Sequence, residues 1–343
     1  MYFAAPEKIE MKYLVIGLGS MGKRRVRNLH ALGVKDVAGF DIRADRRREA
    51  REKYDIAVFD DFDLAVQAFS PQVFIVSTPP DLHMRYAYCA FERGISCFIE
   101  ASVVDADKIK ELSGKVKGGN IVMAPSCTMR YYPGPRKIKE LIHAGAIGKV
   151  LNVNYQTGQY LPDWHPWEKI EDFYVSRRAT GGAREIVPFE LTWLNDIFGE
   201  AVAVACVKAK LTDMPADIDD IYHCLLRYGG NVIVNITVEV ISRPKAVREM
   251  RVLGSEGEIV FSADSNSVRY INTSMGQWKE FKLPLGTVEC QYINPEEPYI
   301  AEMKDFIAAV DAKDQSRFPN SLEDDYAILQ TLHSLEQLAE DSA

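Results

Sequence analysis

The chain has 343 residues, of which 47% are hydrophobic and 26% are charged, and its formal net charge is −8. This length predicts two domains, and the composition is that of a globular protein in water. The acidic balance argues against nucleic acid or a lipid surface as a partner, and no apolar run approaches the ~20 residues that a membrane-spanning helix needs. A small molecule is the expected partner.

The cysteines and histidines argue against disulfides and against a metal site. Six cysteines lie far apart without a C-x-x-C pair, and six histidines are scattered without an H-x-x-x-H or H-E-x-x-H spacing. The opening residues MYFAAPEKIE lack the apolar stretch of a secretory signal. We therefore expect a cytoplasmic protein with reduced thiols and no metal.

A glycine-rich stretch near the amino terminus predicts a dinucleotide-binding domain. In KYLVIGLGSMG a short apolar strand runs into Gly17, Gly19 and Gly22, with Ser20 and Met21 completing the loop before a helix. Gly17 permits the tight turn, Gly19 lets the backbone approach a pyrophosphate, and Gly22 allows close packing of helix on strand. In this context the G-x-G-x-x-G spacing is a strong signal.

Three basic residues, Lys23, Arg24 and Arg25, crowd the first turn of that helix. The helix dipole disfavours cations there. Either a nearby anion or exposure of the three side chains to water would resolve the conflict.

The end of the next strand favours NAD over NADP. Asp41 lies about 20 residues after the glycines, where a carboxylate can accept hydrogen bonds from the adenosine ribose, and Ile42 and Arg43 follow it. Arg43, Arg46 and Arg47 could instead hold the extra phosphate of NADP, or could belong to a solvated helix. NAD is favoured because a carboxylate beside a 2′-phosphate is costly.

Strands and helices alternate through the rest of the first part of the chain. Strands are expected at 72–77, 95–99 and 121–124, and helices near 81–93 and 106–117. Such steps produce a parallel sheet with right-handed crossovers. We therefore predict an α/β chain whose first domain, residues 1–125, has the Rossmann fold.

Residues 126–343 are expected to form an α+β domain for substrate binding and oligomerisation, with a mostly antiparallel open sheet and C-terminal helices that pack back. Its strands are predicted at 151–159, 201–210, 218–228, 232–240, 247–253 and 258–262. The alternate residues of Val232–Val240 are all aliphatic. Because such a run looks too apolar for water, we expect a homodimer or homotetramer packed through the sheet.

Residues 159–182 form a long connection rich in aromatic and basic side chains, which is typical of a binding segment. Aromatic rings stack on sugars, and arginines hold phosphate or carboxylate groups. A nucleotide-linked or acidic sugar would fit, and a hydrophobic lid packed on its own domain is the alternative. The candidate substrate-binding residues are Arg130, Trp164, Trp167, Tyr174, Arg177 and Arg178.

Three motifs together resemble the glucose-fructose oxidoreductase and inositol dehydrogenase (Gfo/Idh/MocA) family. They are GLGSMG at 17–22, STPPDLH at 77–83 and GISCFIEAS at 94–102, and the likeness continues through 129–150 and 181–200. The resemblance implies an oxidoreductase of carbohydrate metabolism that binds NAD(P) in a Rossmann domain. It implies that Thr78, Pro79, Pro80 and His83 line the nicotinamide half of the cofactor, with Glu100 near the ribose. Thr128 is a further candidate for cofactor binding.

Three positions depart from the family pattern. Ala101 and Ser102 stand where the family has the Lys-Pro of Glu-Lys-Pro, and Phe189 stands at the position of the usual histidine. Oxidation of a hydroxyl group needs a proton acceptor within about 3 Å, which neither Ala101 nor Phe189 can supply. We therefore expect a non-standard acceptor.

Glu185 is the first candidate for that acceptor, with Tyr132 and His165 in reserve. It keeps the family's carboxylate position and begins a helix in which Pro188 is expected in the first turn. A carboxylate is a weak base at neutral pH unless burial raises its pKa. The structural alternative is that Glu185 pairs with Arg184 or another arginine.

These observations favour an NAD-dependent oxidoreductase that acts on a sugar or sugar derivative by hydride transfer. One alternative is an NAD-binding homologue without turnover that acts as a sensor or partner protein, which Ala101 and Phe189 favour. Another is a lyase or glycosidase that uses tightly held NAD in a transient oxidation.

Overall fold

The computed structural model describes residues 11–164, 166, 169–172 and 174–341. The chain forms two compact units and passes between them more than once. The first unit comprises Met1–Glu100, Glu111–Ser126 and Tyr299–Leu322, and the second comprises Ala101–Lys110, Cys127–Pro298 and Glu323–Ala343.

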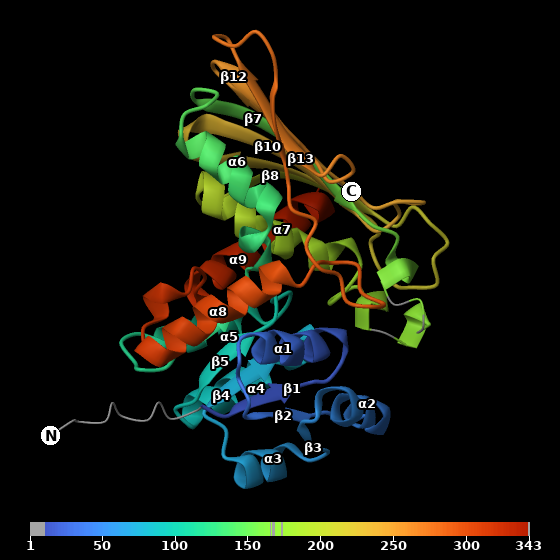
Figure 1. Ribbon diagram of the computed structural model, residues 1–343. Coiled ribbons are helices and arrows are strands. Elements are labelled where there is room, and N and C mark those ends of the chain that lie inside the picture. The colour runs from blue at the N-terminus through green and yellow to red at the C-terminus, as the bar shows by residue number, and fades with distance from the viewer. Residues whose placement is uncertain (1–10, 165, 167–168, 173, 342–343) are drawn as a thin grey trace, which may run out of the picture. The chain divides into compact units, whose positions relative to one another are not determined.

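A six-stranded sheet in the order β3-β2-β1-β4-β5-β6 forms the centre of the first unit (Figure 1, blue to teal). All neighbouring strands are parallel, as predicted. The strand order reverses between β1 and β4, and ligands of such folds bind beyond the carboxyl ends of the strands at that point. The strands are β1 Tyr13–Ile16, β2 Val37–Phe40, β3 Ala57–Phe59, β4 Val73–Val76, β5 Ser96–Ile99 and β6 Met123–Pro125.

Helices complete the first unit. β1, β2, β4 and β5 are buried along their whole length, as expected of a parallel sheet covered on both faces. Phe98 of β5 packs edge-to-face on Phe306, with ring centroids 5.4 Å apart, so a late helix contributes to this core. The sequence pattern does not predict β3, because three residues are too few to show alternation. The helices are α1 Ser20–Ala31, α2 Ala44–Tyr54, α3 Phe62–Phe69, η1 Pro80–Leu82, α4 His83–Glu92, α5 Ala106–Val116 and α8 Glu297–Ala312, of which α5 and α8 are shared with the second unit.

The second unit contains an eight-stranded sheet in the order β14-β13-β12-β11-β7-β10-β9-β8. Every neighbouring pair is antiparallel except β7 and β10, which are parallel, so the predicted mostly antiparallel sheet is confirmed. The strands are β7 Val150–Gly158, β8 Val202–Ala209, β9 Ile221–Tyr228, β10 Val232–Glu239, β11 Val247–Gly254, β12 Gly257–Ser262, β13 Ser267–Asn272 and β14 Lys279–Lys282.

The apolar face of this sheet is already covered within one chain. The alternate aliphatic residues of Val232–Val240 are at most 7% exposed, and α7 (Ala183–Phe198) packs against β9 and β10. The opposite face carries polar side chains, among them Asn154, Asn235 and Thr237, around a hollow of about 660 Å³. The argument that Val232–Val240 needs a second copy for burial is therefore wrong, and the oligomer stays a prediction without that support.

Helix α7 begins one turn before its proline. Gly182 precedes it with φ +66°, and a Cβ there would lie 2.8 Å from the Cβ of Ile218. Pro188 lies inside the helix, so the expectation that it occupies the first turn is wrong. Its missing N–H leaves the Arg184 carbonyl without its usual helical partner. The remaining helices of this unit include α6 Pro133–His143 and α9 Leu322–Asp341.

In the described part of the chain, no helix has both the length and the hydropathy to cross a bilayer.

Candidate active site

The glycine loop forms a cradle at the amino terminus of α1. Gly17 has φ +91°, and a Cβ there would lie 2.6 Å from the Ser77 carbonyl oxygen. A Cβ on Gly22 would lie 1.7 Å from the Gly17 carbonyl oxygen, so neither position tolerates a side chain without backbone movement. A Cβ on Gly19 would meet only the Arg46 guanidinium, at 3.3 Å. The cradle therefore fits a pyrophosphate group, which helix amino termini bind through backbone N–H groups and the dipole.

Asp41 supports this loop from the end of β2. Its Oδ2 accepts a hydrogen bond from the Leu18 backbone N–H at 2.7 Å, and its Oδ1 accepts one from the Arg43 N–H at 2.8 Å. The side chain is only 5% exposed. Each carboxylate oxygen can accept a further hydrogen bond, so a ribose hydroxyl fits here.

The arginines after Asp41 are engaged by groups of the chain itself. Arg43 binds Asp45 at 2.6 Å, and its hydrogen bond lowers the pKa of Asp45 to about 2. Arg47 donates to the carbonyl oxygens of Asp41 and Ile42 at 2.8 and 2.9 Å, and Arg46 lies 3.7 Å from the Asp41 carboxylate. A 2′-phosphate would therefore have to displace existing partners.

An apolar side chain is exposed at this edge of the sheet. Ile42 is 81% exposed, directly after the carboxylate of Asp41. A cavity of about 350 Å³ lies beside it and is lined in part by Phe40, Tyr86 and Arg85. An exposed aliphatic group at this edge of the sheet suits the flat face of a nucleobase.

α1 begins at Ser20, so Arg24 and Arg25 lie in its second turn and not in the first, and the three basic residues near its start contact carboxylates and an aromatic ring. Arg25 is completely buried between Glu100 and Glu302, at 2.7 and 2.9 Å. Lys23 pairs with Glu49 at 2.6 Å. Arg24 is also buried, with its guanidinium 4.1 Å from the ring centroid of Tyr299. Lys23 and Arg25 therefore have nearby anions, which are carboxylates of the protein itself. The alternative that all three side chains point into water is wrong.

Glu100 follows β5 and is held as a charged acceptor. Arg25 binds both of its oxygens, and the Ser77 hydroxyl donates to Oε1 at 3.1 Å. The side chain keeps 13% of its exposure. The carboxylate is therefore fixed in place at the carboxyl end of its strand.

Residues 78–83 follow β4 at the same edge of the sheet. The His83 Nε2 lies 2.8 Å from the Thr78 carbonyl oxygen, and His83 is only 2% exposed. The Thr78 hydroxyl is buried and has no hydrogen-bond partner among the described residues. Pro79 precedes η1 and Pro80 begins it. A buried hydroxyl of this kind is a candidate hydrogen-bond partner for a bound ligand.

Glu185 lies in the second unit, in the first turn of α7. The Tyr174 hydroxyl donates to its Oε1 at 2.6 Å, whereas Oε2 is buried and has no partner among the described residues. Burial raises the pKa of Glu185 to about 7, although the Tyr174 hydrogen bond opposes the rise. Arg184 binds Glu336 at 2.6 Å, so the alternative pairing of Glu185 with Arg184 is wrong.

The remaining predicted site residues of the second unit differ in exposure. Tyr132 is half-buried and precedes α6, and Thr128 is 1% exposed. Trp164 is half-buried, and its Nε1 is buried without a hydrogen-bond partner among the described residues. His165 and Trp167 lie outside the described residues.

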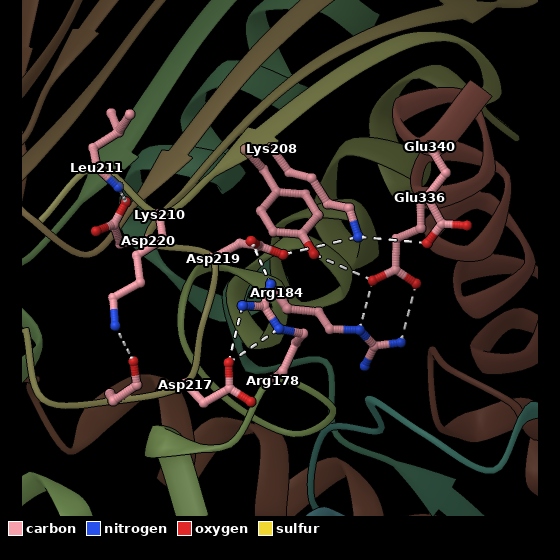
Figure 2. Close-up of polar contacts among 12 residues, drawn as sticks. Arg178, Arg184, Lys208, Lys210, Leu211, Asp217, Asp219, Asp220, Glu336 and Glu340 are labelled. Atoms are coloured by element: carbon pink, nitrogen blue, oxygen red, sulfur yellow. Dashed lines mark hydrogen bonds and ion pairs between the residues drawn. The ribbon is translucent and has the colours of Figure 1, made fainter. Parts of the chain in front are cut away.

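Two of the three candidate arginines have carboxylate partners of their own. Figure 2 shows Arg178 reaching Asp219 at 2.6 Å and Asp217 at 2.9 Å. Arg130 donates to the Thr192 carbonyl oxygen at 3.0 Å and lies 3.8 Å from an oxygen of Asp196. Arg177 is exposed. The sequence does not reveal these pairings, because the partners lie 39 or more residues away.

The glycine cradle, the buried parallel strands and the carboxylate after β2 make a dinucleotide-binding domain, and the family models agree. Residues 11–118 match the oxidoreductase family with an NAD-binding Rossmann fold, and residues 136–260 match the GFO/IDH/MocA C-terminal domain. The chain belongs to the Gfo/Idh/MocA oxidoreductase family.

Several characterised members are similar to this chain. D-xylose 1-dehydrogenase (NADP(+)) of Hypocrea jecorina is 25% identical over 240 residues, which cover 63% of this chain and 60% of that protein. Inositol 2-dehydrogenase of Salmonella typhimurium is 27% identical over 150 residues, which cover 42% and 45%. The chain therefore spans 60% or less of the length of these two relatives.

A solved structure of levoglucosan dehydrogenase in complex with NADH and levoglucosan shares the fold. The TM-score is 0.82 at 18% identity, and the match covers 97% of this chain and 98% of that one. At this identity the likeness shows the fold alone.

The segment that replaces the Lys-Pro of the Gfo/Idh/MocA family is anchored in the second unit. Ser102 is 5% exposed and hydrogen-bonds to Asp325 of α9, and the Val103 carbonyl oxygen accepts from Arg184 at 2.8 Å. Burial raises the pKa of Asp325 to about 7. Its Oδ2 has no partner among the described residues. Sequence reasoning missed Asp325, and its position in an acidic first helical turn offers no signal that would have found it.

Proposed function

We propose that the protein is an NAD-dependent oxidoreductase that oxidises a hydroxyl group of a sugar or sugar derivative. The observation that carries the proposal is Glu185, whose Oε2 is buried and has no partner among the described residues and whose pKa is raised to about 7. Such a group can accept a proton near neutral pH. Family membership supports the reaction class, and the named relatives are dehydrogenases of sugars and polyols.

The first unit would hold the cofactor. The glycine cradle and the amino terminus of α1 would bind the pyrophosphate, and Asp41 would accept hydrogen bonds from the adenosine ribose. Thr78, His83 and Glu100 are the polar groups proposed for the nicotinamide half. When bound, NAD accepts the hydride that leaves the substrate carbon.

The preference for NAD over NADP is proposed on two grounds. Asp41 presents a negative charge where the 2′-phosphate of NADP would lie, and burial makes that repulsion stronger. Arg43 is neutralised by Asp45, and Arg47 is held by two carbonyl oxygens. One relative is named for NADP, so the proposed preference rests on the residues of this chain alone.

Glu185 is the proposed proton acceptor. As the hydride leaves the substrate carbon, the proton of the substrate hydroxyl passes to Oε2, and a carbonyl product remains. The Tyr174 hydroxyl donates to the other oxygen and so stabilises the charged form that must exist before the reaction. The proposal requires the reacting hydroxyl to come within about 3 Å of Oε2.

An uncharged sugar fits the second unit better than an acidic one. Arg178 and Arg130, which would have held a phosphate or carboxylate, already lie against aspartates of the chain. Trp164 and Tyr174 remain as the proposed aromatic contacts of the sugar. A nucleotide-linked or acidic sugar is therefore the second candidate for the substrate.

The test is turnover of a broad sugar panel by the purified protein. Free, phosphorylated and nucleotide-linked sugars are offered with NAD, and NADH formation is followed by absorbance. We expect one class of free sugar to be oxidised, and Glu185→Gln to abolish that oxidation while NAD affinity changes less than about threefold. A protein that binds NAD but oxidises none of the panel would instead support the sensor or partner role.

A further inference from the structure

Arg184 lies directly before Glu185 in the first turn of α7 and is 9% exposed. Figure 2 shows its guanidinium facing the Glu336 carboxylate in a two-pronged contact, with distances of 2.6 and 3.2 Å. Its Nη1 also donates to the carbonyl oxygens of Val103 at 2.8 Å and Ala179 at 2.6 Å. One largely buried side chain thus joins three segments that are distant in sequence.

Each of these segments belongs to the second unit. Val103 follows the Ala101 and Ser102 replacements, and Glu336 lies on α9. Ala179 lies in the segment that carries Tyr174. Within that segment the Thr180 hydroxyl donates to the Tyr174 carbonyl oxygen at 3.0 Å. The contact at Ala179 therefore bears on the residue that binds Glu185.

The start of α7 is held by further backbone contacts. The Gly182 N–H donates to the Val175 carbonyl oxygen at 3.0 Å, and the Ala183 N–H donates to that of Asp219 at 3.2 Å. Glu336 also accepts from the Tyr222 hydroxyl at 3.2 Å, which keeps the partner of Arg184 in place. The guanidinium is thus a fixed group between fixed neighbours.

We propose that Arg184 is a positioning residue for Glu185, which holds the Tyr174 segment and the first turn of α7 closed around the Glu185 carboxyl group and keeps water from it. The catalytic meaning of this inference rests on the proposed function. The positioning of the Glu185 carboxyl group by Arg184 does not depend on the proposed function.

The charges around Glu185 allow a clear test. The titratable group that faces its carboxyl is the Tyr174 phenol. Arg184 is neutralised by Glu336, and Arg178 by Asp217 and Asp219. Lys208 of β8 lies 3.8 Å from Asp219 and also 3.8 Å from Glu340, which belongs to α9. No arginine or lysine of the described residues forms an ion pair with Glu185.

The two possible influences of Arg184 on the pKa of Glu185 have opposite signs. If Arg184 acted as a nearby positive charge, its removal would raise the pKa. If it acts by keeping the carboxyl buried, its removal admits water and lowers the pKa towards the ordinary value. The direction of the change therefore separates positioning from charge.

The experiment is a pH titration by carbon-13 NMR of protein labelled at glutamate carboxyl carbons, with Glu185→Gln identifying the Glu185 signal. We expect the wild-type signal to titrate at about 7. Arg184→Gln should lower that pKa by at least about one unit, and Arg184→Lys should lower it less. The control is Arg251→Gln, which removes the same charge from a surface pair with Glu258 and should change nothing.

An unchanged or raised pKa in Arg184→Gln would overturn the inference. Circular dichroism checks that each variant is folded. If Arg184→Gln does not fold, Arg184→Lys and Glu336→Gln decide, and both must lower the pKa of Glu185. Where the wild type oxidises a sugar, the acid limb of its kcat/KM profile should move by the same amount. A wild type that oxidises no sugar would end the proposed function, while the NMR result would still decide the role of Arg184.

Discussion

The Tyr174 hydroxyl lies 2.6 Å from Oε1 of Glu185, so the aromatic segment supplies a hydrogen-bond donor to the carboxyl group at the start of α7. The other oxygen, Oε2, is left buried and without a partner among the described residues. This arrangement separates the two oxygens by role, because one is held and the other is available to accept a proton.

Replacing Tyr174 by phenylalanine should move the acid limb of the pH profile. The hydroxyl stabilises the charged form of Glu185, so its loss raises the pKa of Glu185 further above 7, by about one unit if the hydrogen bond contributes ~1.5 kcal/mol. The kcat/KM of sugar oxidation should then rise to its plateau at a higher pH than in the wild type. Tyr160→Phe, in the same segment, is the control. An acid limb that stays in place or moves to lower pH would contradict the role given to Tyr174.

Glu185→Gln should stabilise the folded protein at alkaline pH. Because the folded-state pKa is raised to about 7, the contribution of this group is complete below its unfolded value of ~4.3 and is lost as pH rises through about 7. A glutamine does not ionise, so the variant escapes that loss. Urea unfolding should give similar stabilities near pH ~4.5 and a gain of at most ~3.7 kcal/mol for the variant near pH ~8.5. Asp325 is present in both proteins, so its effect cancels in the comparison. If the wild type and the variant were equally stable at both pH values, Glu185 would not be buried.

The cofactor preference should depend on Asp41 and on the Arg43–Asp45 pair. Fluorescence titration should show NADH binding at least about tenfold more tightly than NADPH, a difference of ~1.4 kcal/mol. Asp41→Ser should weaken NADH binding and so reduce the ratio of the affinity for NADH to the affinity for NADPH. Asp45→Asn releases Arg43 and should strengthen NADPH binding while leaving NADH nearly unchanged. Tighter binding of NADPH by the wild type would reverse the assignment in favour of the arginines.

Arg25 should be essential for the stability of the first unit. Arg25→Met would leave Glu100 and Glu302 buried without their cation, which costs ~3–5 kcal/mol in comparable sites. The matched control is Arg43→Met, which breaks the exposed pair with Asp45 and should cost less than ~1 kcal/mol. Both values come from urea unfolding. A loss for Arg25→Met no larger than the control's would mean that the buried carboxylates become protonated without penalty.

The prediction of an oligomer now depends on the polar face of the second sheet. Light scattering at micromolar concentration should give a multiple of the 38.7 kDa chain mass. If this face is the contact, Asn235→Arg should shift the mass towards the monomer, because Asn235 lines the hollow and the substitution places a charge there on each copy. Asp264→Arg, at an exposed position beyond β12, is the control. A monomeric wild type would end the prediction.

Much of the first unit follows from short stretches of sequence. Gly17 and Gly22 are required by contacts within a few residues or with the neighbouring strand, and the four-residue apolar strands β1 and β4 are buried as their composition predicts. Asp41 follows its strand at the distance that a ribose contact requires. Apart from the contact of Gly17 with Ser77, these features are local, so the order of residues along the chain determines them.

The outcome for the charged residues was decided by the tertiary structure. Arg25 has a partner on a helix 277 residues later, and Arg178 has partners 39 and 41 residues later. The sequence shows that Arg25 crowds a helix start but not which carboxylate neutralises it. The electrostatic state of a side chain depends on distances in space and on the water excluded around it, and neither quantity is encoded in a short window of residues.

Glu185 combines the two kinds of information. Its place at the start of a helix, four residues before Phe189, follows from the sequence and the family pattern. Its pKa of about 7 does not, because burial in the folded chain raises the pKa and the hydrogen bond of Tyr174 lowers it in part. Arg184 shows the same division: the sequence places it beside Glu185, whereas only the fold directs its guanidinium to Glu336, Val103 and Ala179 instead. Adjacent residues on a helix point in different directions, so neighbours in sequence need not be partners in space.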